Sequence, residues 1–301
     1  MHKTCMKSRI IRYFRATLDF LLFSNLFIAL CSVAQGLVTY QLLDVKPQKH
    51  ILGLLFFATL AQYNFSILIS KPAKPQDSPF RRVKWIFSHH RLMITLTIIS
   101  ILSLIPLALF LSLNSKILLF SLGVISVAYG LPIFSSHNKK FGLRNIPGVK
   151  LFLIAIVWSL STVWLPIIEL ENASSSSISS WDTLLLITKR FLFVAAITIP
   201  FDIRDLFQDR SSALKTIPVM LGEKKALLFC QALLMAYLIL LFLFNNGFDK
   251  NFIALSLTIL LSGWLIFHSN FVRNEYYYFL FLDGTLILQF VMLVLVNNIS
   301  L

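Results

Sequence analysis

The segment 201–222, FDIRDLFQDRSSALKTIPVMLG, concentrates charged side chains in a chain that is otherwise mostly apolar. Its acidic residues are Asp202, Asp205 and Asp209, and its basic residues are Arg204, Arg210 and Lys215. Carboxylates spaced i, i+3 and i+7 fall on one face of a helix, where three like charges repel one another. A divalent cation that takes oxygen ligands, such as Mg²⁺ holding a diphosphate, would remove that repulsion. The alternative is a solvated loop in which the aspartates form salt bridges with the two arginines.

The rest of the chain has the composition of a membrane protein. Of its 301 residues, 57% are hydrophobic and only 13% are charged, about half the charge of a soluble chain. The mean hydropathy is +0.79. Apolar runs of about 20 residues are what a helix needs to cross a bilayer. We identify nine: 18–43, 51–70, 92–113, 117–134, 150–169, 183–201, 225–244, 251–268 and 278–297.

These runs predict an all-α membrane protein with nine transmembrane helices. The first run is too long, and too well followed by others, to be a cleaved signal peptide. We expect one polytopic membrane domain over residues 1–301, with a basic tail at 1–17 and a nine-helix bundle at 18–297. The cysteines are only Cys5, Cys31 and Cys230, which have no metal-ligand spacing and suggest no disulfide framework.

The basic residues predict the orientation of the bundle. With the N-terminus in the cytoplasm, 21 of the 27 Lys and Arg residues fall inside. They lie in the tail, in 71–91, 135–150 and 202–225, and at Arg273. This asymmetry follows the positive-inside rule, so the net charge of +14 indicates topology and not nucleic-acid binding. The C-terminus would lie outside, and a site among the large polar loops would face the cytoplasm.

Four polar or charged positions within the apolar runs, or at their ends, have two interpretations each. Asn64 fits either a functional site or an interhelical hydrogen bond. Lys150 either contributes to a site or extends to the lipid headgroups. Arg190, next to Lys189, either extends outward or pairs with Glu169, Glu171 or Asp182, and we expect a structural role. Asp283 is either a paired helix contact or a polar group of a pocket, and a pocket is the interpretation we favour.

The residues at 204–222, RDLFQDRSSALKTIPVMLG, resemble the second aspartate motif of the UbiA superfamily of intramembrane prenyltransferases. The matching positions are Asp205, Asp209, Thr216, Val219 and Gly222, with Lys215 at a commonly basic position. Ala213 stands where the family usually has glycine. The segment 129–140, YGLPIFSSHNKK, is similar to the loop with Tyr and basic residues after the fourth helix of the family.

The resemblance implies that a prenyl group moves from a polyprenyl diphosphate to a small acceptor, aromatic or a quinone precursor. It implies Mg²⁺ held by Asp202, Asp205 and Asp209, with Asn64 also in the catalytic site. The diphosphate contacts that it suggests are Lys139, Lys140, Arg144, Lys150, Arg204 and Lys215. The other partner would be membrane lipid, and a bacterial inner membrane is the expected location.

The first aspartate motif of the family is not matched. Leu68 and Pro72 stand where acids are usual after Asn64, and Asp77 lies thirteen residues beyond Asn64. Either one metal ion suffices, with help from basic residues, or the chain is a catalytically reduced relative that binds isoprenoid or lipid or supports a partner. The candidate helpers are Lys71, Lys74, Arg81 and Arg82. A transporter is a third hypothesis, although the related halves or broken helix pairs common in transporters are not evident.

Overall fold

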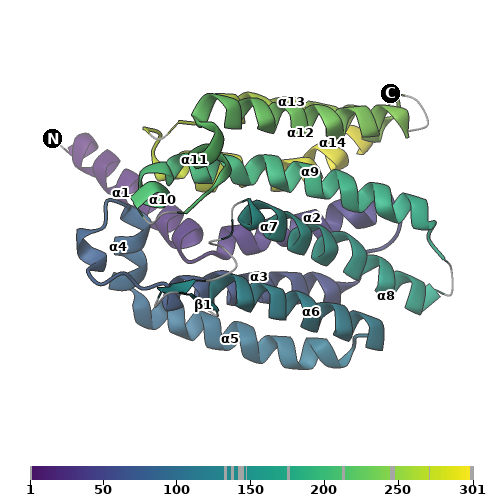
Figure 1. Ribbon diagram of the computed structural model, residues 1–301, viewed down its shortest axis with the longest axis horizontal. Coiled ribbons are helices and arrows are strands. Elements are labelled where there is room, and N and C mark those ends of the chain that lie inside the picture. The colour runs from purple at the N-terminus through teal and green to yellow at the C-terminus, as the bar shows by residue number, and fades with distance from the viewer. Residues whose placement is uncertain are drawn as a thin grey trace.

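The computed structural model describes residues 2–131, 134–136, 139–141, 146, 148–174, 177–211, 214–244, 248–270 and 272–298 (Figure 1). The first half contains α1 (His2–Phe23), α2 (Leu26–Leu42), α3 (Lys49–Ile69), η1 (Pro75–Asp77), α4 (Arg81–Ser88), α5 (His90–Leu109) and α6 (Leu113–Gly130). The second half contains α7 (Val149–Ser159), η3 (Leu160–Trp164), α8 (Leu165–Ser174), α9 (Ser180–Arg204), α10 (Leu206–Ser211), α11 (Ile217–Leu221), α12 (Glu223–Leu243), α13 (Lys250–Phe267), η4 (Tyr277–Leu282) and α14 (Gly284–Asn298). The segments η3 and η4 are π-helical.

The long helices indicate an integral multi-pass membrane protein. Among the described residues, seven helical segments are long and apolar enough to cross a membrane. They are Lys49–Ile69, His90–Leu109, Val149–Ala173, Ser180–Arg204, Glu223–Leu243, Lys250–Phe267 and Tyr277–Asn298. The pair Ile11–Phe23 and Leu26–Leu42 is bent by 62° and counts as an eighth if it is one span, while Leu113–Tyr129 is shorter. The count of nine stays a prediction.

The main hydrophobic core lies where α2, α7, α9, α12, α13 and α14 meet. Small residues at these contacts, such as Ala196 of α9, Ala226 of α12 and Ala254 of α13, are fully buried and let the helices approach closely. Large apolar side chains on α5 and α6, such as Leu102 and Phe120, are exposed, as expected for a surface in contact with lipid. The apolar runs therefore form both the core and the outer surface of the bundle.

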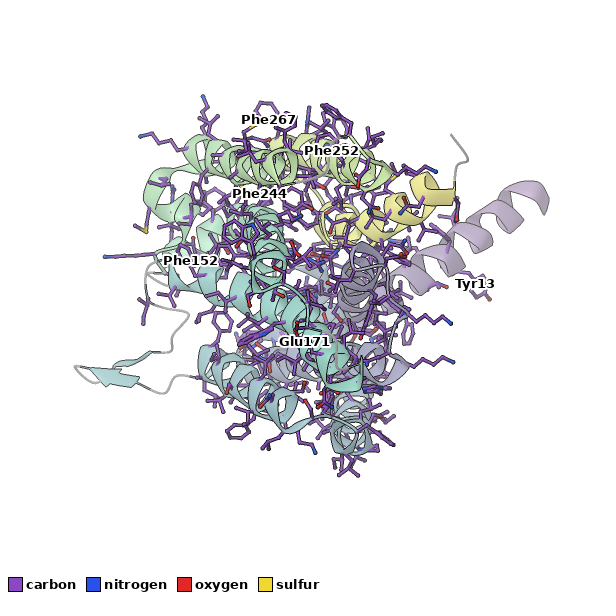
Figure 2. The ribbon with its side chains drawn as sticks, turned by 90° about the vertical axis from the view of Figure 1, so that its right-hand side faces the viewer. Tyr13, Phe152, Glu171, Phe244, Phe252 and Phe267 are labelled. Atoms are coloured by element: carbon purple, nitrogen blue, oxygen red, sulfur yellow. The ribbon has the colours of Figure 1, made fainter. Side chains whose placement is uncertain are left out.

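One pair of short strands departs from the all-α prediction. Strands β1 (Phe134–Ser136) and β2 (Lys139–Phe141) pair antiparallel, with Phe134 opposite Phe141 and Ser136 opposite Lys139. The hairpin extends away from the helices (Figure 2). It lies in a segment that the sequence predicts as a polar loop, and it leaves the helical class of the bundle unchanged.

The polar connections gather at one end of the bundle. Figure 1 shows α4, α10 and α11 near this end, together with the C-terminal end of α9 and the N-terminal end of α7. These elements come from the loops that the charge pattern assigns to one side. The grouping agrees with that assignment, and the side of the membrane that this end faces stays a prediction.

Arg190 is buried at the middle of the bundle and joins three elements. Its guanidinium donates hydrogen bonds to the carbonyl of Gln35 (2.8 Å) and to the hydroxyls of Thr162 (3.1 Å) and Thr39 (3.4 Å). Arg190 therefore links α9 to α2 and to η3. A structural role is confirmed, but its partners are neutral oxygen atoms and not the acids that we considered.

The break between α1 and α2 is fixed by Asn25. Its φ of 68° lies in the left-handed region, which Asn adopts more readily than most residues. Its Nδ2 donates to Oδ1 of Asn64 at 2.6 Å, and its Oδ1 accepts from Arg82. Asn25 thus ends α1 and joins α3 and α4 to the break.

Two substitutions at Asn25 separate its backbone role from its hydrogen bonds. Asn25→Gly should destabilise the protein by about 1–3 kcal/mol, because Asn64 loses its partner while the backbone stays unstrained. Asn25→Ala should cost about 1–2 kcal/mol more, because alanine disfavours the left-handed conformation. Unfolding of the purified chain in detergent would measure both, and equal stability of the two variants would contradict the assigned strain.

Candidate functional site

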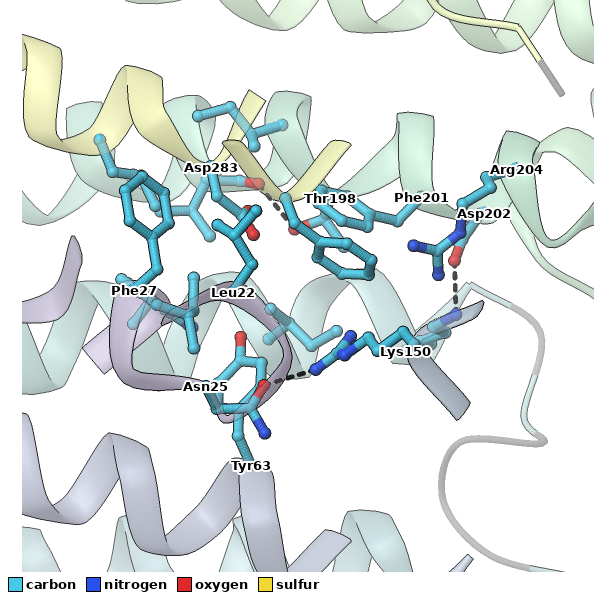
Figure 3. A pocket seen from close by; sticks show the side chains of 18 residues that line it. Leu22, Asn25, Phe27, Tyr63, Lys150, Thr198, Phe201, Asp202, Arg204 and Asp283 are labelled. Carbon is cyan, nitrogen blue, oxygen red and sulfur yellow. Dashed lines mark hydrogen bonds and ion pairs between the residues drawn. The ribbon is translucent and has the colours of Figure 1, made fainter. Parts of the chain in front are cut away.

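A cavity of about 180 Å³ lies among the ends of several helices (Figure 3). Its polar and charged lining residues are Asn25, Tyr63, Arg82, Lys150, Thr198, Asp202, Arg204 and Asp283. The remaining lining residues are apolar and include Leu22, Phe27, Ile154, Trp158, Phe201 and Phe279. The cavity therefore combines a cluster of charged groups with hydrophobic walls.

One side of the cavity is formed by an ion pair between α7 and α9. Lys150 Nζ lies 2.5 Å from Asp202 Oδ1, and the Asp202 side chain is 2% exposed. Gly148, with a φ of 73°, precedes α7, and Lys150 is the second residue of that helix. Lys150 therefore points into the protein and pairs with Asp202, the first aspartate of the segment 201–222, rather than extending to lipid headgroups.

Asp205, the second aspartate of the segment 201–222, forms an ion pair with the preceding residue, Arg204. Arg204 donates from Nε and from Nη2 to the two carboxylate oxygens of Asp205, each at 2.8 Å. The pair is possible because α9 ends at Arg204, whereas neighbouring side chains on a continuous helix diverge. Our expectation that one helix carries all three aspartates on one face is therefore wrong. The break places Arg204 in the cavity, with its guanidinium 4.9 Å from the Phe279 ring centre.

Arg82 provides a second guanidinium that has no carboxylate partner among the described residues. It donates a hydrogen bond to Asn25, and its guanidinium lies 4.3 Å from the ring centre of Phe279. Its Nε is buried without a hydrogen-bond partner. Burial lowers the pKa of Arg82 to about 10, and the charge of Arg204 lowers it in the same direction. Arg82 remains protonated at neutral pH; Asp283 and Glu275 favour its charge from a distance, but no described acid forms an ion pair with it.

Asp209, the third aspartate of the segment 201–222, has a carboxylate oxygen without a hydrogen-bond partner. Asp209 of α10 is 5% exposed, and its Oδ2 is buried without a hydrogen-bond partner, as is Oγ1 of Thr216. Burial raises the pKa of Asp209; Lys150 opposes this rise, while Asp202 and Asp205 add to it. Carboxylate and hydroxyl oxygens are ligands that Mg²⁺ accepts, so Asp209 is the motif residue that best fits a divalent cation. Within the described part of the chain, no group of three His, Cys, Asp or Glu residues is placed to hold a metal ion.

None of the other suggested residues that the structure describes lines this cavity. Asn64 is fully buried and forms the interhelical hydrogen bond with Asn25, and its catalytic role stays a prediction. Lys215 is exposed. Lys139 and Lys140 lie in β2, where only the backbone is described, and Arg144 lies outside the described residues. Asp77 is exposed in η1 and lines no cavity among the described residues, so it does not replace the acids missing at 68 and 72.

Two further cavities adjoin the first on the side of α3, α6 and α7. Their volumes are about 430 Å³ and about 250 Å³, and Tyr63 and Trp158 line all three. Arg82 lines the first and the third. Most of the lining is apolar, with residues such as Leu54, Leu104, Leu119 and Leu122 in the largest. The charged cavity therefore lies next to apolar space that suits a hydrocarbon chain.

Several polar residues of the cavity were not among the site residues predicted from the sequence. Arg82 appeared only as a possible helper, while Asn25 and Tyr63 were not assigned to the site. Asn25 is a polar side chain within an apolar run, which is a signal for function or for interhelical contacts. The preference for Asp283 as a polar group of a pocket is confirmed, because it lines the cavity.

Comparison with known proteins places this arrangement in a family. The model of the UbiA prenyltransferase family matches residues 86–277. A UbiA homologue from Archaeoglobus fulgidus, solved with GPP and Mg²⁺, superposes with a TM-score of 0.64 at 13% identity, covering 93% of this chain and 100% of that one. The apo UbiA homologue from Aeropyrum pernix K1 gives 0.60 at 15% identity, covering 93% and 98%.

A third solved structure, described as a digeranylgeranylglyceryl phosphate synthase, gives a TM-score of 0.53 at 14% identity and covers 93% of this chain and 97% of that one. At these identities the structures show a shared fold. No curated protein matches the chain in sequence. Because the family model covers more than half of the residues, the chain belongs to the UbiA prenyltransferase family.

Proposed function

We propose that the protein is a Mg²⁺-dependent intramembrane prenyltransferase. It transfers a prenyl group from a polyprenyl diphosphate to a small aromatic or quinone-precursor acceptor. The observation that carries this proposal is a cavity lined by Arg82, Lys150 and Arg204, beside two mostly apolar cavities. A prenyl diphosphate has the matching form, since an anionic head is joined to a hydrocarbon tail. We place the protein in a bacterial inner membrane, with the N-terminus and the site on the cytoplasmic side.

The head group would bind among Arg82, Arg204 and Lys150. Guanidinium groups form paired, charge-assisted hydrogen bonds with phosphate oxygens, and Arg82 has donor capacity that no described acid uses. The Archaeoglobus fulgidus homologue was solved with GPP or with DMAPP, in each case with Mg²⁺. These ligands of a relative with the same fold support the proposal that this protein binds a prenyl diphosphate.

The tail would occupy the apolar cavities beside Tyr63 and Trp158. Transfer of the tail from the bilayer into these cavities exchanges one hydrocarbon environment for another, so van der Waals packing, and not removal from water, would favour its binding. The walls also keep water away from the reacting carbon, which prevents simple hydrolysis. Recognition of the donor would thus be divided between charged contacts at the head and non-directional burial of the tail.

In the reaction, the bond between C1 of the prenyl group and the diphosphate oxygen breaks, and the electron pair leaves with the diphosphate. A bound Mg²⁺ would supply charge neutralisation at the departing diphosphate. Arg82 and Arg204 would donate hydrogen bonds to the same developing charge. The acceptor then supplies the electron pair for the new bond and loses a proton.

One set of observations favours the second candidate function, a catalytically reduced relative that binds the isoprenoid without transferring it. Asp202 and Asp205 are already neutralised by Lys150 and Arg204, and the first motif lacks its acids at 68 and 72. The two candidates differ in turnover. An assay of membranes with labelled prenyl diphosphates and a panel of aromatic acids and quinone precursors, with and without Mg²⁺, would separate them.

Removal of the Asp209 carboxylate should reduce the gain in diphosphate affinity that Mg²⁺ provides. Wild-type protein should bind geranyl thiodiphosphate more tightly in Mg²⁺ than in EDTA, and Asp209→Asn should reduce this gain at least about tenfold, because a neutral amide is a weaker ligand. Titration calorimetry in detergent would measure both affinities. Asp77→Asn, a change at an exposed aspartate outside the cavity, is the control. Equal wild-type binding with and without Mg²⁺ would favour the reduced relative.

Arg82 should contribute directly to binding of the head group. Arg82→Gln should weaken binding of geranyl thiodiphosphate about 10- to 100-fold, the equivalent of one hydrogen bond to a charged group. Arg82→Lys should retain part of the affinity, because the charge remains without the two-pronged geometry. The same calorimetric titration applies, with Arg91→Gln at an exposed position of α5 as the matched control. Unchanged affinity in Arg82→Gln would place the diphosphate elsewhere.

A further inference from the structure

Asp283 is a carboxylate on the cavity wall that the proposed chemistry has not used. It lies between η4 and α14, and its backbone N–H donates to the carbonyl of Tyr278 at 3.1 Å, a π-helical pattern. Its own carbonyl accepts a hydrogen bond from Sγ of Cys31 at 3.3 Å. The backbone is thus held from two elements. The carboxylate itself forms no hydrogen bond or ion pair with any residue that the structure describes.

The surroundings of this carboxylate require a partner from outside the chain. Figure 3 shows Asp283 on one side of the cavity and the Lys150–Asp202 pair on the opposite side. Leu22, Phe27 and Leu286 line the cavity as well. Arg82 and Arg204 line the same cavity and attract this carboxylate from a distance, but no hydrogen bond or ion pair with a described residue replaces the solvation that it loses. A π-helical segment at a site is also a frequent sign of function, because it turns a side chain out of the regular helical order.

We infer that Asp283 binds the acceptor through a hydroxyl group and takes its proton during transfer. The inference rests on the proposed function. If the diphosphate occupies the side of Arg204 and Lys150, within reach of Arg82, the prenyl C1 points away from Arg204 and Lys150. The nucleophile then approaches from the opposite side, where Asp283 is located. A general base must be within hydrogen-bond reach of the proton that it removes, and Asp283 is the carboxylate that lines this side.

The atoms and electrons of this step balance. The O–H bond of the acceptor breaks, the proton goes to the carboxylate of Asp283, and the electron pair remains on the acceptor. That pair forms the new bond to C1 of the prenyl group, from the oxygen or from a ring carbon conjugated with it. In the second case, the hydrogen displaced from the ring carbon returns to the oxygen as a proton. The bond from C1 to the diphosphate breaks, and its pair leaves with the diphosphate.

The position of Asp283 in the cavity also favours acceptors without a negative charge. An acceptor with its own carboxylate near Asp283 would bring two like charges together in an apolar cavity. The described cations that line the cavity are Arg82, Arg204 and Lys150, and the diphosphate engages all three in the proposed function. No described cation of the cavity then remains for a second anion. The acceptor class that fits is therefore a neutral phenol or hydroquinone, and not an aromatic acid.

The experiment uses the full chain in detergent with Mg²⁺, labelled geranyl diphosphate and two matched acceptors, a hydroquinone and a hydroxybenzoic acid. Wild-type protein should prenylate the hydroquinone at least about tenfold faster. Asp283→Asn should reduce kcat about 100-fold or more, the usual range for loss of a general base, while the KM for geranyl diphosphate changes less than about twofold. Asp283→Glu should restore part of kcat. Asp77→Asn is the control for loss of an exposed aspartate.

The outcomes separate this inference from the proposed function. A kcat for Asp283→Asn within about twofold of wild type overturns the role of Asp283 as the base, as does a loss of kcat that Asp283→Glu does not restore. Equal or faster transfer to the hydroxybenzoic acid, or transfer to neither acceptor while geranyl diphosphate still binds, overturns the acceptor class and leaves the donor site standing. If the wild-type protein does not bind geranyl diphosphate at all, the proposed function itself fails. A direct binding measurement of each variant shows that the donor site has folded.

Discussion

A charge inside a hydrocarbon layer is stable only when another charge or a set of hydrogen-bonding groups neutralises it, and this constraint organises the protein. The pair between Lys150 and Asp202 joins the start of α7 to the end of α9. Removal of one partner of such a buried pair typically costs about 3–5 kcal/mol, because the other charge is left without compensation. Arg190 meets the same requirement with neutral oxygens from α2 and η3. These polar contacts therefore fix the arrangement of helices whose apolar surfaces alone would allow other packings.

The site is the place where this neutralisation is incomplete. Lys150 and Arg204 have carboxylate partners, whereas Arg82 has the side chain of Asn25 and an aromatic face. On the acidic side, Asp209 has an oxygen without a partner, and Asp283 faces the cavity without one. Unmatched groups of both signs in a single region are what a charged ligand, a cation and a hydroxyl donor would complete. The binding properties that we propose follow from charges that the chain leaves uncompensated.

The loss of acids from the first aspartate motif changes which groups can neutralise a bound diphosphate. Without acids at 68 and 72, the α3 side of the site cannot contribute carboxylates to a metal, and Asp77 is too exposed to replace them. The positive charge near the cavity comes instead from Arg82 on α4, which lies against Phe279. A guanidinium neutralises a diphosphate without an intervening ion, although it does not polarise the leaving group as strongly as a metal does. The balance between arginine and metal is thus the property in which this chain differs from the pattern of its family.

The amino-acid sequence alone determined the helical membrane class, the family and the segment 201–222, because each depends on local patterns. Apolar runs set the helices, and the spacing of Asp205, Asp209, Thr216 and Gly222 carries the resemblance. Tertiary structure alone decided which charges meet, since Lys150 and Asp202 are 52 positions apart and Arg82 and Asn25 are 57 apart. It also decided that α9 ends at Arg204, so that Asp205 is neutralised by its neighbour. No local pattern encodes such pairings, because they depend on how distant helices pack, and for the same reason only the tertiary structure shows that Arg82, Asp209 and Asp283 form no ion pair with another described residue.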